Sequence, residues 1–187
     1  MLSGGLDSLG CLYKILTSDE YRGCKIHVHH LHLKNIENRA VAESIAVKNI
    51  LTYFKDKDLT YTESMHVYPV INNHFIYDID ICAFIAGTIC QCDPDIQYIA
   101  MGLTLLDESQ EFKNRFLRYL DILKATLPKD QILIYPVMYM TKKQVYDSLP
   151  ADLRVLAWSC RTPSYINNNP IPCGQCKTCR SLDELRS

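Results

Sequence analysis

The hydrophobic and polar residues of this chain fall into blocks whose period changes between that of a helix and that of a strand. Apolar residues recur every three or four positions in several stretches, which predicts helices. These stretches are residues 8–16, 37–54, 79–90 and 112–127, with a shorter helix from Thr141. Between them, runs of five to nine residues with a strand-like pattern predict strands at 25–33, 65–71, 97–101 and 132–137. Strands that alternate with helices indicate βαβ units, so we expect an α/β fold with an open parallel sheet and helices on both faces.

Length, composition and charge narrow the class of protein. The chain has 187 residues, 48% of them hydrophobic, and can bury one core. Its formal net charge of −1 argues against a protein dominated by non-specific nucleic-acid binding, so nucleic acid is not the expected substrate. There is no run of 18 apolar residues, so we expect no membrane contact. The sequence opens with Met1-Leu2-Ser3-Gly4-Gly5, which is too short and too polar to form the apolar region of a secretory signal, so we expect a cytoplasmic protein.

The glycine-rich turn Ser3-Gly4-Gly5-Leu6-Asp7-Ser8 carries the first chemical indication. Adjacent glycines allow the backbone to approach a polyphosphate closely, and the helix that follows offers unpaired N–H groups to an anion. Ser3 and Ser8 add hydroxyl groups, and Asp7 could orient the loop or help to hold Mg²⁺. A plain Gly-Gly turn is the alternative. In an α/β fold such a loop follows a strand, yet only Met1 and Leu2 precede it, so we expect the sequence to begin partway through that strand.

Four of the nine cysteines lie close together near the end of the sequence: Cys160, Cys173, Cys176 and Cys179. Four thiolates complete the tetrahedral shell of a structural Zn²⁺ site and leave no open position for catalysis. An iron–sulfur cluster is the alternative metal centre, and disulfides would not suit a reducing compartment. The other five cysteines have apolar neighbours and are interpreted as small buried residues. We therefore expect a nucleotide-binding α/β domain over residues 1–155 and a zinc-binding segment over 156–187 that packs on it.

Residues Ser3 to Ser8 resemble the loop of the PP-loop ATP pyrophosphatases, whose fold is the adenine nucleotide alpha hydrolase-like type. The loop lacks the lysine and the spacing of a Walker A motif, so transfer of a γ-phosphoryl group is not expected. Together with the Cys-Gly-x-Cys-x-x-Cys motif, the loop is similar to that of the 7-cyano-7-deazaguanine synthases. The match covers residues 2–12 and 159–180.

The resemblance implies a specific reaction. The family adenylates 7-carboxy-7-deazaguanine, forms the amide with ammonia, and uses a second ATP to dehydrate the amide to a nitrile. Ser3, Gly4, Gly5, Leu6, Asp7 and Ser8 would bind ATP with Mg²⁺, and Ser3, Asp7 and Ser8 would be the catalytic residues. The four cysteines would hold the structural zinc, and a homodimer would be plausible.

Three segments depart from the family pattern. His29 to Asn35 stands where the family has Asp-Tyr-Gly-Gln, Tyr77 to Asp80 stands in place of Pro-Gly-Arg-Asn, and Thr104 to Lys113 replaces Tyr-Pro-Asp-Cys-Arg. Two alternatives therefore stay open. One is a divergent PP-loop enzyme that adenylates a different carboxylate or base, as in phage or defence-related 7-deazaguanine chemistry or in an amidotransferase-like or tRNA sulfurtransferase-type reaction. The other is a non-catalytic nucleotide-binding subunit.

Four histidines occur within the first predicted strand. Alternation places His27 and His29 on one face and His30 and His32 on the other. Either pair could bind a metal ion, but hydrogen-bonded or exposed histidines at a sheet end are the simpler interpretation.

Overall fold

Two pairs of parallel strands form the framework of the protein in the computed structural model, which describes residues 1–67, 77–104, 110–128 and 131–186. β1 (Ile26–Lys34) pairs with β2 (Leu59–Val67), from Ile26 opposite Leu59 to Lys34 opposite Val67. β3 (Tyr98–Ala100) pairs with β4 (Ile132–Ile134). The helices are α1 (Leu6–Thr17), α2 (Ala40–Tyr53), α3 (Asp78–Cys92), α4 (Gln110–Thr126), α5 (Lys142–Ser148), α6 (Ala151–Arg154) and α7 (Lys177–Arg186), with a 3₁₀ turn at Asp19–Tyr21.

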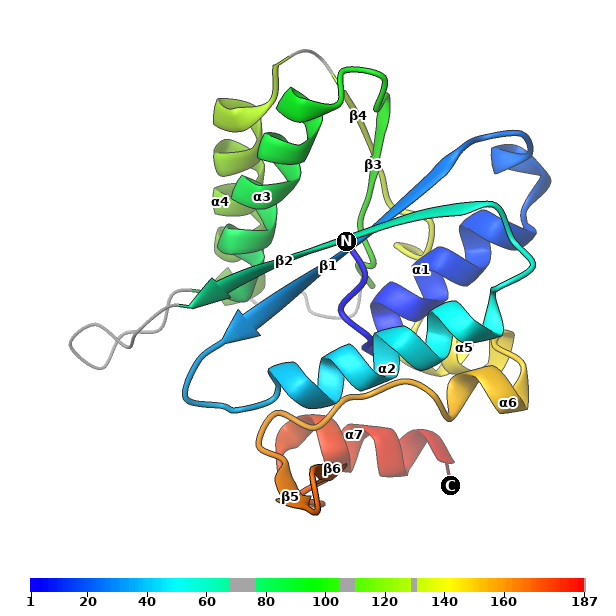
Figure 1. Cartoon of the computed structure of the whole chain (residues 1–187), viewed down its shortest axis with the longest axis vertical. Coiled ribbons are helices and arrows are strands. Elements are labelled where there is room, and N and C mark those ends of the chain that lie inside the picture. Colours follow the sequence, from blue (N-terminus) through cyan, green and yellow to red (C-terminus); the bar gives the residue numbers. More distant parts are fainter. Residues whose placement is uncertain (68–76, 105–109, 129–130, 187) are drawn as a thin grey trace.

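Helices cover both faces of β1, as the alternation of its side chains requires. Val28 packs into a cluster with Val47 and Ile50 of α2, whereas Leu31 and Leu33 contact Ile81 of α3. Residues an odd number apart on a strand point to opposite faces, which explains this division. Figure 1 shows α3 and α4 on one side of the β1–β2 pair and α1 and α2 on the other.

The N-terminal residues lie beside β1. The Leu2 amide donates a hydrogen bond to the His29 carbonyl oxygen at 2.8 Å, and Leu2 itself is buried. Met1 packs against the cluster of α3, α4 and β3 and also against the Leu31 cluster. Among the described residues the strands form separate two-stranded sheets, so the single open parallel sheet stays a prediction.

Most predicted elements appear with their boundaries shifted by a few residues. The strand expected from residue 65 instead begins at Leu59, and its predicted residues 68–71 lie outside the described residues. Thr141 accepts a hydrogen bond from the Gln144 amide and the Gln144 side chain accepts one from the Thr141 amide, so the predicted capping box is confirmed.

The C-terminal segment contains a hairpin that the sequence interpretation missed. β5 (Ser164–Ile166) and β6 (Asn169–Ile171) are antiparallel and are joined by Asn167 and Asn168, both with positive φ. A two-residue turn of this kind requires positive φ twice, which asparagine tolerates. The hairpin contacts α2, and α7 contacts α5. None of the described helices is long and apolar enough to cross a membrane.

Candidate phosphate loop and metal centre

The Ser3–Ser8 loop turns sharply into α1. Gly5 is the residue before the helix and has no side chain with which to cap it, so the first N–H groups of α1 have no cap from this position. The two serine hydroxyls lie 3.0 Å apart, and Ser8 Oγ donates to the Gly5 carbonyl oxygen. Ser3 Oγ accepts from the Gly5 amide at 3.4 Å. The serines thus brace the turn at the positive end of the α1 dipole, where an anion is stabilised.

Neighbouring backbone holds this loop from two sides. Gly4 has a φ of +80°, and a Cβ atom there would lie 3.0 Å from the carbonyl oxygen of Glu43. A Cβ atom on Gly102 would lie 2.4 Å from the carbonyl oxygen of Asp7. The Trp158 amide donates to the Gly4 carbonyl oxygen at 2.8 Å. Gly102 leaves no room for a Cβ atom, whereas at Gly4 the positive φ and the close Glu43 carbonyl oxygen would strain any other residue.

Asp7 stands at the start of α1 opposite the first residue of α5. Its Oδ2 lies 3.7 Å from Lys142 Nζ, and its Oδ1 is buried with no hydrogen-bond partner among the described residues. Burial raises the pKa of Asp7, and the Lys142 charge opposes that effect. An acceptor oxygen left without a donor suits a cation such as Mg²⁺, which prefers carboxylate oxygen.

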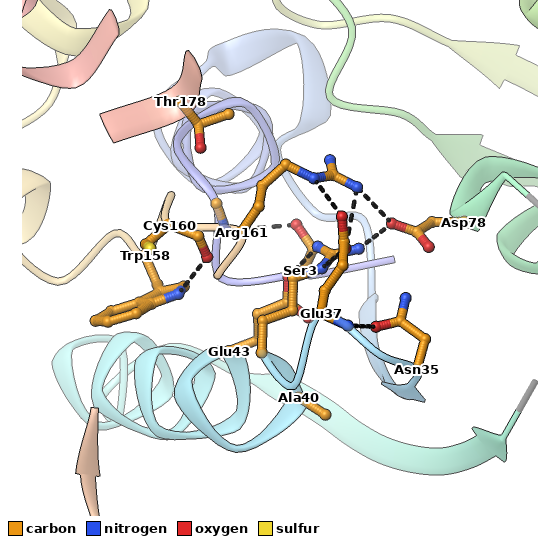
Figure 2. Close-up of polar contacts among 12 residues, drawn as sticks. Ser3, Asn35, Glu37, Ala40, Glu43, Asp78, Trp158, Cys160, Arg161 and Thr178 are labelled. Atoms are coloured by element: carbon orange, nitrogen blue, oxygen red, sulfur yellow. Dashed lines mark hydrogen bonds and ion pairs between the residues drawn. The ribbon is translucent and has the colours of Figure 1, made fainter. Parts of the chain in front are cut away.

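Beside the loop lies a network of two arginines and three carboxylates, which we call the Arg39–Arg161 network: Arg39, Arg161, Glu37, Glu43 and Asp78. Arg39 pairs with all three carboxylates. Arg161 pairs with Glu37 through two N–H groups, at 2.9 and 3.1 Å, and lies 3.6 Å from Asp78 (Figure 2). Burial raises the pKa of Glu43 to about 7, and the Asp78 carboxylate adds to this effect, against the charges of Arg39 and Arg161.

This network was not predicted from the sequence. In the sequence the Tyr77–Asp80 segment stands out only as a departure from a family motif, yet Asp78 joins the network and Asp80 pairs with Arg118 at 2.7 Å. The one local signal is the i,i+4 spacing of Arg39 and Glu43 at the start of the predicted helix. Nothing local indicates Arg161, which contacts Glu37 across 124 positions of sequence.

The loop and the network meet in one pocket of about 260 Å³, slightly smaller than typical small-molecule sites. Its wall includes Ser3, Gly5, Leu6, Asp7, Ser8, Arg39, Glu43, Lys142 and Arg161. Gly4 does not line the pocket, although it sets the path of the loop. The pocket thus combines helix N–H groups with three cationic side chains, a combination that suits a polyphosphate.

The four C-terminal cysteines form a cluster that could hold a metal ion. One Sγ atom from each of Cys160, Cys173, Cys176 and Cys179 lies within 4.8 Å of all the others. Gly174, with a φ of +69°, turns the chain between Cys173 and Cys176. Thr162 Oγ1 donates to Cys173 Sγ at 3.3 Å, and this hydrogen bond lowers the pKa of the Cys173 thiol. The donor set and its spacing fit a structural zinc ion, with no disulfide among the four.

The histidines of β1 are satisfied by hydrogen bonds. His29 contacts the Thr62 and Ser64 hydroxyls at 2.8 and 2.9 Å, and burial lowers its pKa to about 4. His30 and His32 both contact the Ser44 hydroxyl, at 3.3 and 2.7 Å. Among the described residues, the group whose side chains lie close enough to hold a metal ion is the cysteine cluster, and it includes none of these histidines.

No model of a known protein family matches the chain. No curated protein matches it either. The interpretation of the site therefore rests on the chemistry of its own residues.

Proposed function

We propose that this protein is an ATP-dependent ligase that adenylates 7-carboxy-7-deazaguanine and converts it, with ammonia, to 7-cyano-7-deazaguanine. The observation that carries the proposal is the braced Ser3–Ser8 loop at the start of α1, in a pocket that also holds Lys142, Arg39 and Arg161. The resemblance of the loop and the cysteine motif to the synthase family supplies the substrate.

In the proposed reaction a carboxylate oxygen of the acceptor attacks the α-phosphorus of ATP. The bond from that phosphorus to the bridging oxygen breaks, pyrophosphate leaves, and an acyl-AMP remains. Ammonia then displaces AMP and loses a proton to give the amide. With a second ATP the amide oxygen is adenylated in the same way, and loss of AMP and two protons gives the nitrile.

The residues of this chain act mainly by position and charge. The N–H groups of α1 and the hydroxyls of Ser3 and Ser8 would hold the β- and γ-phosphates. Lys142 and the two arginines would stabilise the negative charge that develops on pyrophosphate as it leaves. Holding acceptor and nucleotide together reduces the entropic part of the barrier.

The residues present fit the two metal ions that the proposal requires. Asp7, whose Oδ1 has no donor among the described residues, would hold Mg²⁺, and that ion would neutralise phosphate charge. The four cysteines would hold Zn²⁺ away from the chemistry as a closed structural site.

A pyrophosphate-release assay tests the proposal. Purified zinc-loaded protein is incubated with ATP, Mg²⁺, ammonium and 7-carboxy-7-deazaguanine, and product masses are measured alongside. Pyrophosphate with a nitrile product is expected. An amide that accumulates would limit the activity to the first half-reaction. Absence of pyrophosphate from folded, zinc-loaded protein would refute the ligase.

One observation favours a second candidate, a nucleotide-binding subunit without catalysis. Both arginines of the pocket are already paired with carboxylates, and Glu43 itself lines the wall. If no carboxylate acceptor tried gives pyrophosphate but Mg·ATP binds in a calorimetric titration, this second function holds. An enzyme with a different carboxylate acceptor would instead release pyrophosphate once that acceptor is supplied.

Replacement of Asp7 tests the loop directly. Asp7→Ala removes the unpartnered carboxylate oxygen, and we expect turnover to fall by at least about 100-fold while the fold is retained. Asp19→Ala is the matched control, because Asp19 is an exposed acid outside the pocket. Unchanged turnover in Asp7→Ala would remove Asp7 from the proposed site.

A further inference from the structure

The cysteine segment forms part of the wall of the phosphate pocket. Ser159, Cys160 and Arg161 line the pocket, as do Thr178 and Ser181 on either side of Cys179. Trp158 connects the segment to the loop. Its amide donates a hydrogen bond to the Gly4 carbonyl oxygen, and its indole N–H donates one to the Cys160 carbonyl oxygen at 2.9 Å. A metal ion that orders the four cysteines would therefore also order this wall.

Arg161 lines the pocket, and its guanidinium is held by two carboxylates. Arg161 and Arg39 line the pocket, whereas Glu37 and Asp78, which pair with both arginines, do not. In Figure 2 the Arg161 side chain extends from the chain beside Cys160 toward Glu37 and Asp78. The two contacts to Glu37 use Nε and Nη2, and Nη1 has no partner among the residues that the structure describes. A carboxylate that pairs with two N–H groups of a guanidinium fixes its orientation, and the other N–H groups can still donate to a ligand.

We propose that Arg161 binds an anionic group of the ligand, a phosphate or a carboxylate, and that metal bound at the cysteine cluster holds Arg161 in place to do so. Metal occupancy and anion binding are then coupled. The proposal rests on the proposed function only for the identity of the anion. The cysteine segment thus contributes a binding residue in addition to its structural role.

Coupling between two sites is reciprocal for binding equilibria. If zinc strengthens anion binding by some factor, the bound anion strengthens zinc binding by the same factor. Arg161 carries that coupling, because it adjoins the ligand Cys160 and lines the anion pocket. Typical coupling between protein sites is about 5- to 150-fold.

The first test measures binding of Mg·ATP and of Mg·pyrophosphate by calorimetry to zinc-loaded wild-type, Arg161→Ala and Arg180→Ala proteins. Arg180 lies on the same segment, is exposed and does not line the pocket, so its variant has the same net charge change. We expect Arg161→Ala to weaken binding about tenfold or more with zinc content unchanged, and Arg180→Ala to bind within about twofold of wild type. Equal affinities for wild type and Arg161→Ala, for every anion tried, would overturn the proposal.

A titration with 7-carboxy-7-deazaguanine separates the two sources of the anion. Weaker pyrophosphate binding by Arg161→Ala assigns Arg161 to phosphate, and weaker binding of the acceptor alone assigns it to the carboxylate. Wild-type protein that binds pyrophosphate through Arg161 but releases none from ATP would refute the ligase and leave this inference standing. If wild-type protein turns over ATP and Arg161→Ala leaves anion binding unchanged, the ligase proposal stands and this inference is overturned.

The second test measures zinc affinity by competition with a chromophoric chelator, with and without saturating Mg·ATP. Because ATP itself binds zinc, the Arg161→Ala protein serves as the reference. We expect Mg·ATP to tighten zinc binding at least about fivefold more in wild type than in Arg161→Ala. The same response in both proteins would overturn the coupling.

Discussion

Gly4 combines a strained backbone with a close neighbour, and Gly4→Ala tests both. Its φ is +80°, and an added Cβ atom would lie 3.0 Å from the Glu43 carbonyl oxygen and 3.1 Å from the Ala46 Cβ. We expect Gly4→Ala to lower the free energy of unfolding by about 2–4 kcal/mol and to weaken binding of Mg·ATP. Urea denaturation and calorimetry measure the two effects.

Gly23 provides the control that separates strain from collision. It has a φ of +83°, but no atom lies within 4 Å of an added Cβ atom. Gly23→Ala should therefore cost only the strain, about 1–2 kcal/mol, and leave nucleotide binding unchanged. If both variants lose the same stability, close packing at Gly4 contributes nothing.

The Glu43 carboxyl gives the protein a pH-dependent stability. Burial raises its pKa from 4.5 to about 7, and the Asp78 carboxylate adds to this effect against the charge of Arg39. The folded state thus binds this proton more tightly than the unfolded state does. The resulting stability is present in full below about pH 4.5 and is lost as the pH rises through about 7.

Glu43→Gln removes this titration while Arg39 keeps Glu37 and Asp78 as partners. We expect the free energy of unfolding of the variant, relative to wild type, to increase between pH 5 and pH 8 by up to about 3 kcal/mol. Urea denaturation at several pH values measures it. A difference that is constant across this range would show that Glu43 has the same pKa in both states.

At the residue scale, what could be predicted depends on distance along the sequence. The Ser3–Ser8 loop is a local motif, and the hydrogen bonds within it join residues at most five positions apart. The cysteine cluster was predicted because Cys173, Cys176 and Cys179 lie within seven residues of sequence and only Cys160 is remote. The Arg39–Arg161 network joins three distant segments, and no local pattern encodes which charged residues will meet there.

At the scale of elements, helices with an apolar stripe were predicted, as was α5 from its capping box, whereas the polar helix α7 was not. α1 and α3 were expected from their periodicity and are present. α7 was missed because its sequence is mostly polar and buries only Cys179. The β5–β6 hairpin was missed because its six residues include Pro170 and Asn169, which are rare in strands.

The contact between α1 and α5 depends on Gly10. A Cβ atom there would lie 2.3 Å from Cγ1 of Val145, which is fully buried. We expect Gly10→Ala to lower the free energy of unfolding by about 1–3 kcal/mol. Because Lys142 is the first residue of α5, a displaced helix should also separate Lys142 from Asp7 and weaken nucleotide binding.

A double-mutant cycle with Val145→Ala identifies the cause. That change removes Cγ1 and leaves the Val145 Cβ position 3.7 Å from the new methyl group, an ordinary contact. The double variant should therefore be more stable than the sum of the single effects predicts, by about 1 kcal/mol or more. Simple additivity in urea denaturation would mean that the methyl group introduced by Gly10→Ala does not meet Val145.

At the scale of the whole molecule, the α/β character and the helices on both faces of β1 follow from the sequence, but the arrangement of the strands does not. Periodicity identifies a strand without identifying its neighbours, because pairing is set by contacts between distant segments. Leu2 lies beside β1, which belongs to one parallel pair. Met1 contacts the hydrophobic cluster of α3, α4 and β3, and β3 belongs to the other pair. The same limit applies to the C-terminal segment, whose contacts with α2 and α5 no local pattern indicates.

Metal at the cysteine cluster should stabilise the whole molecule, because the segment it orders contacts the loop, α2 and α5. Cys176→Ser removes one of four ligands whose sulfur atoms lie within 4.8 Å of one another. Because metal binding to such a site is coupled to folding, we expect loss of zinc and a fall in Tm of roughly 6–12 °C. Atomic emission gives the zinc content, and calorimetry gives Tm with and without a chelator.

Cys24→Ser is the control, because Cys24 is exposed and outside the cluster, and this variant should keep both its zinc and its Tm. If wild-type protein keeps its Tm after the metal is removed, the cluster does not stabilise the fold.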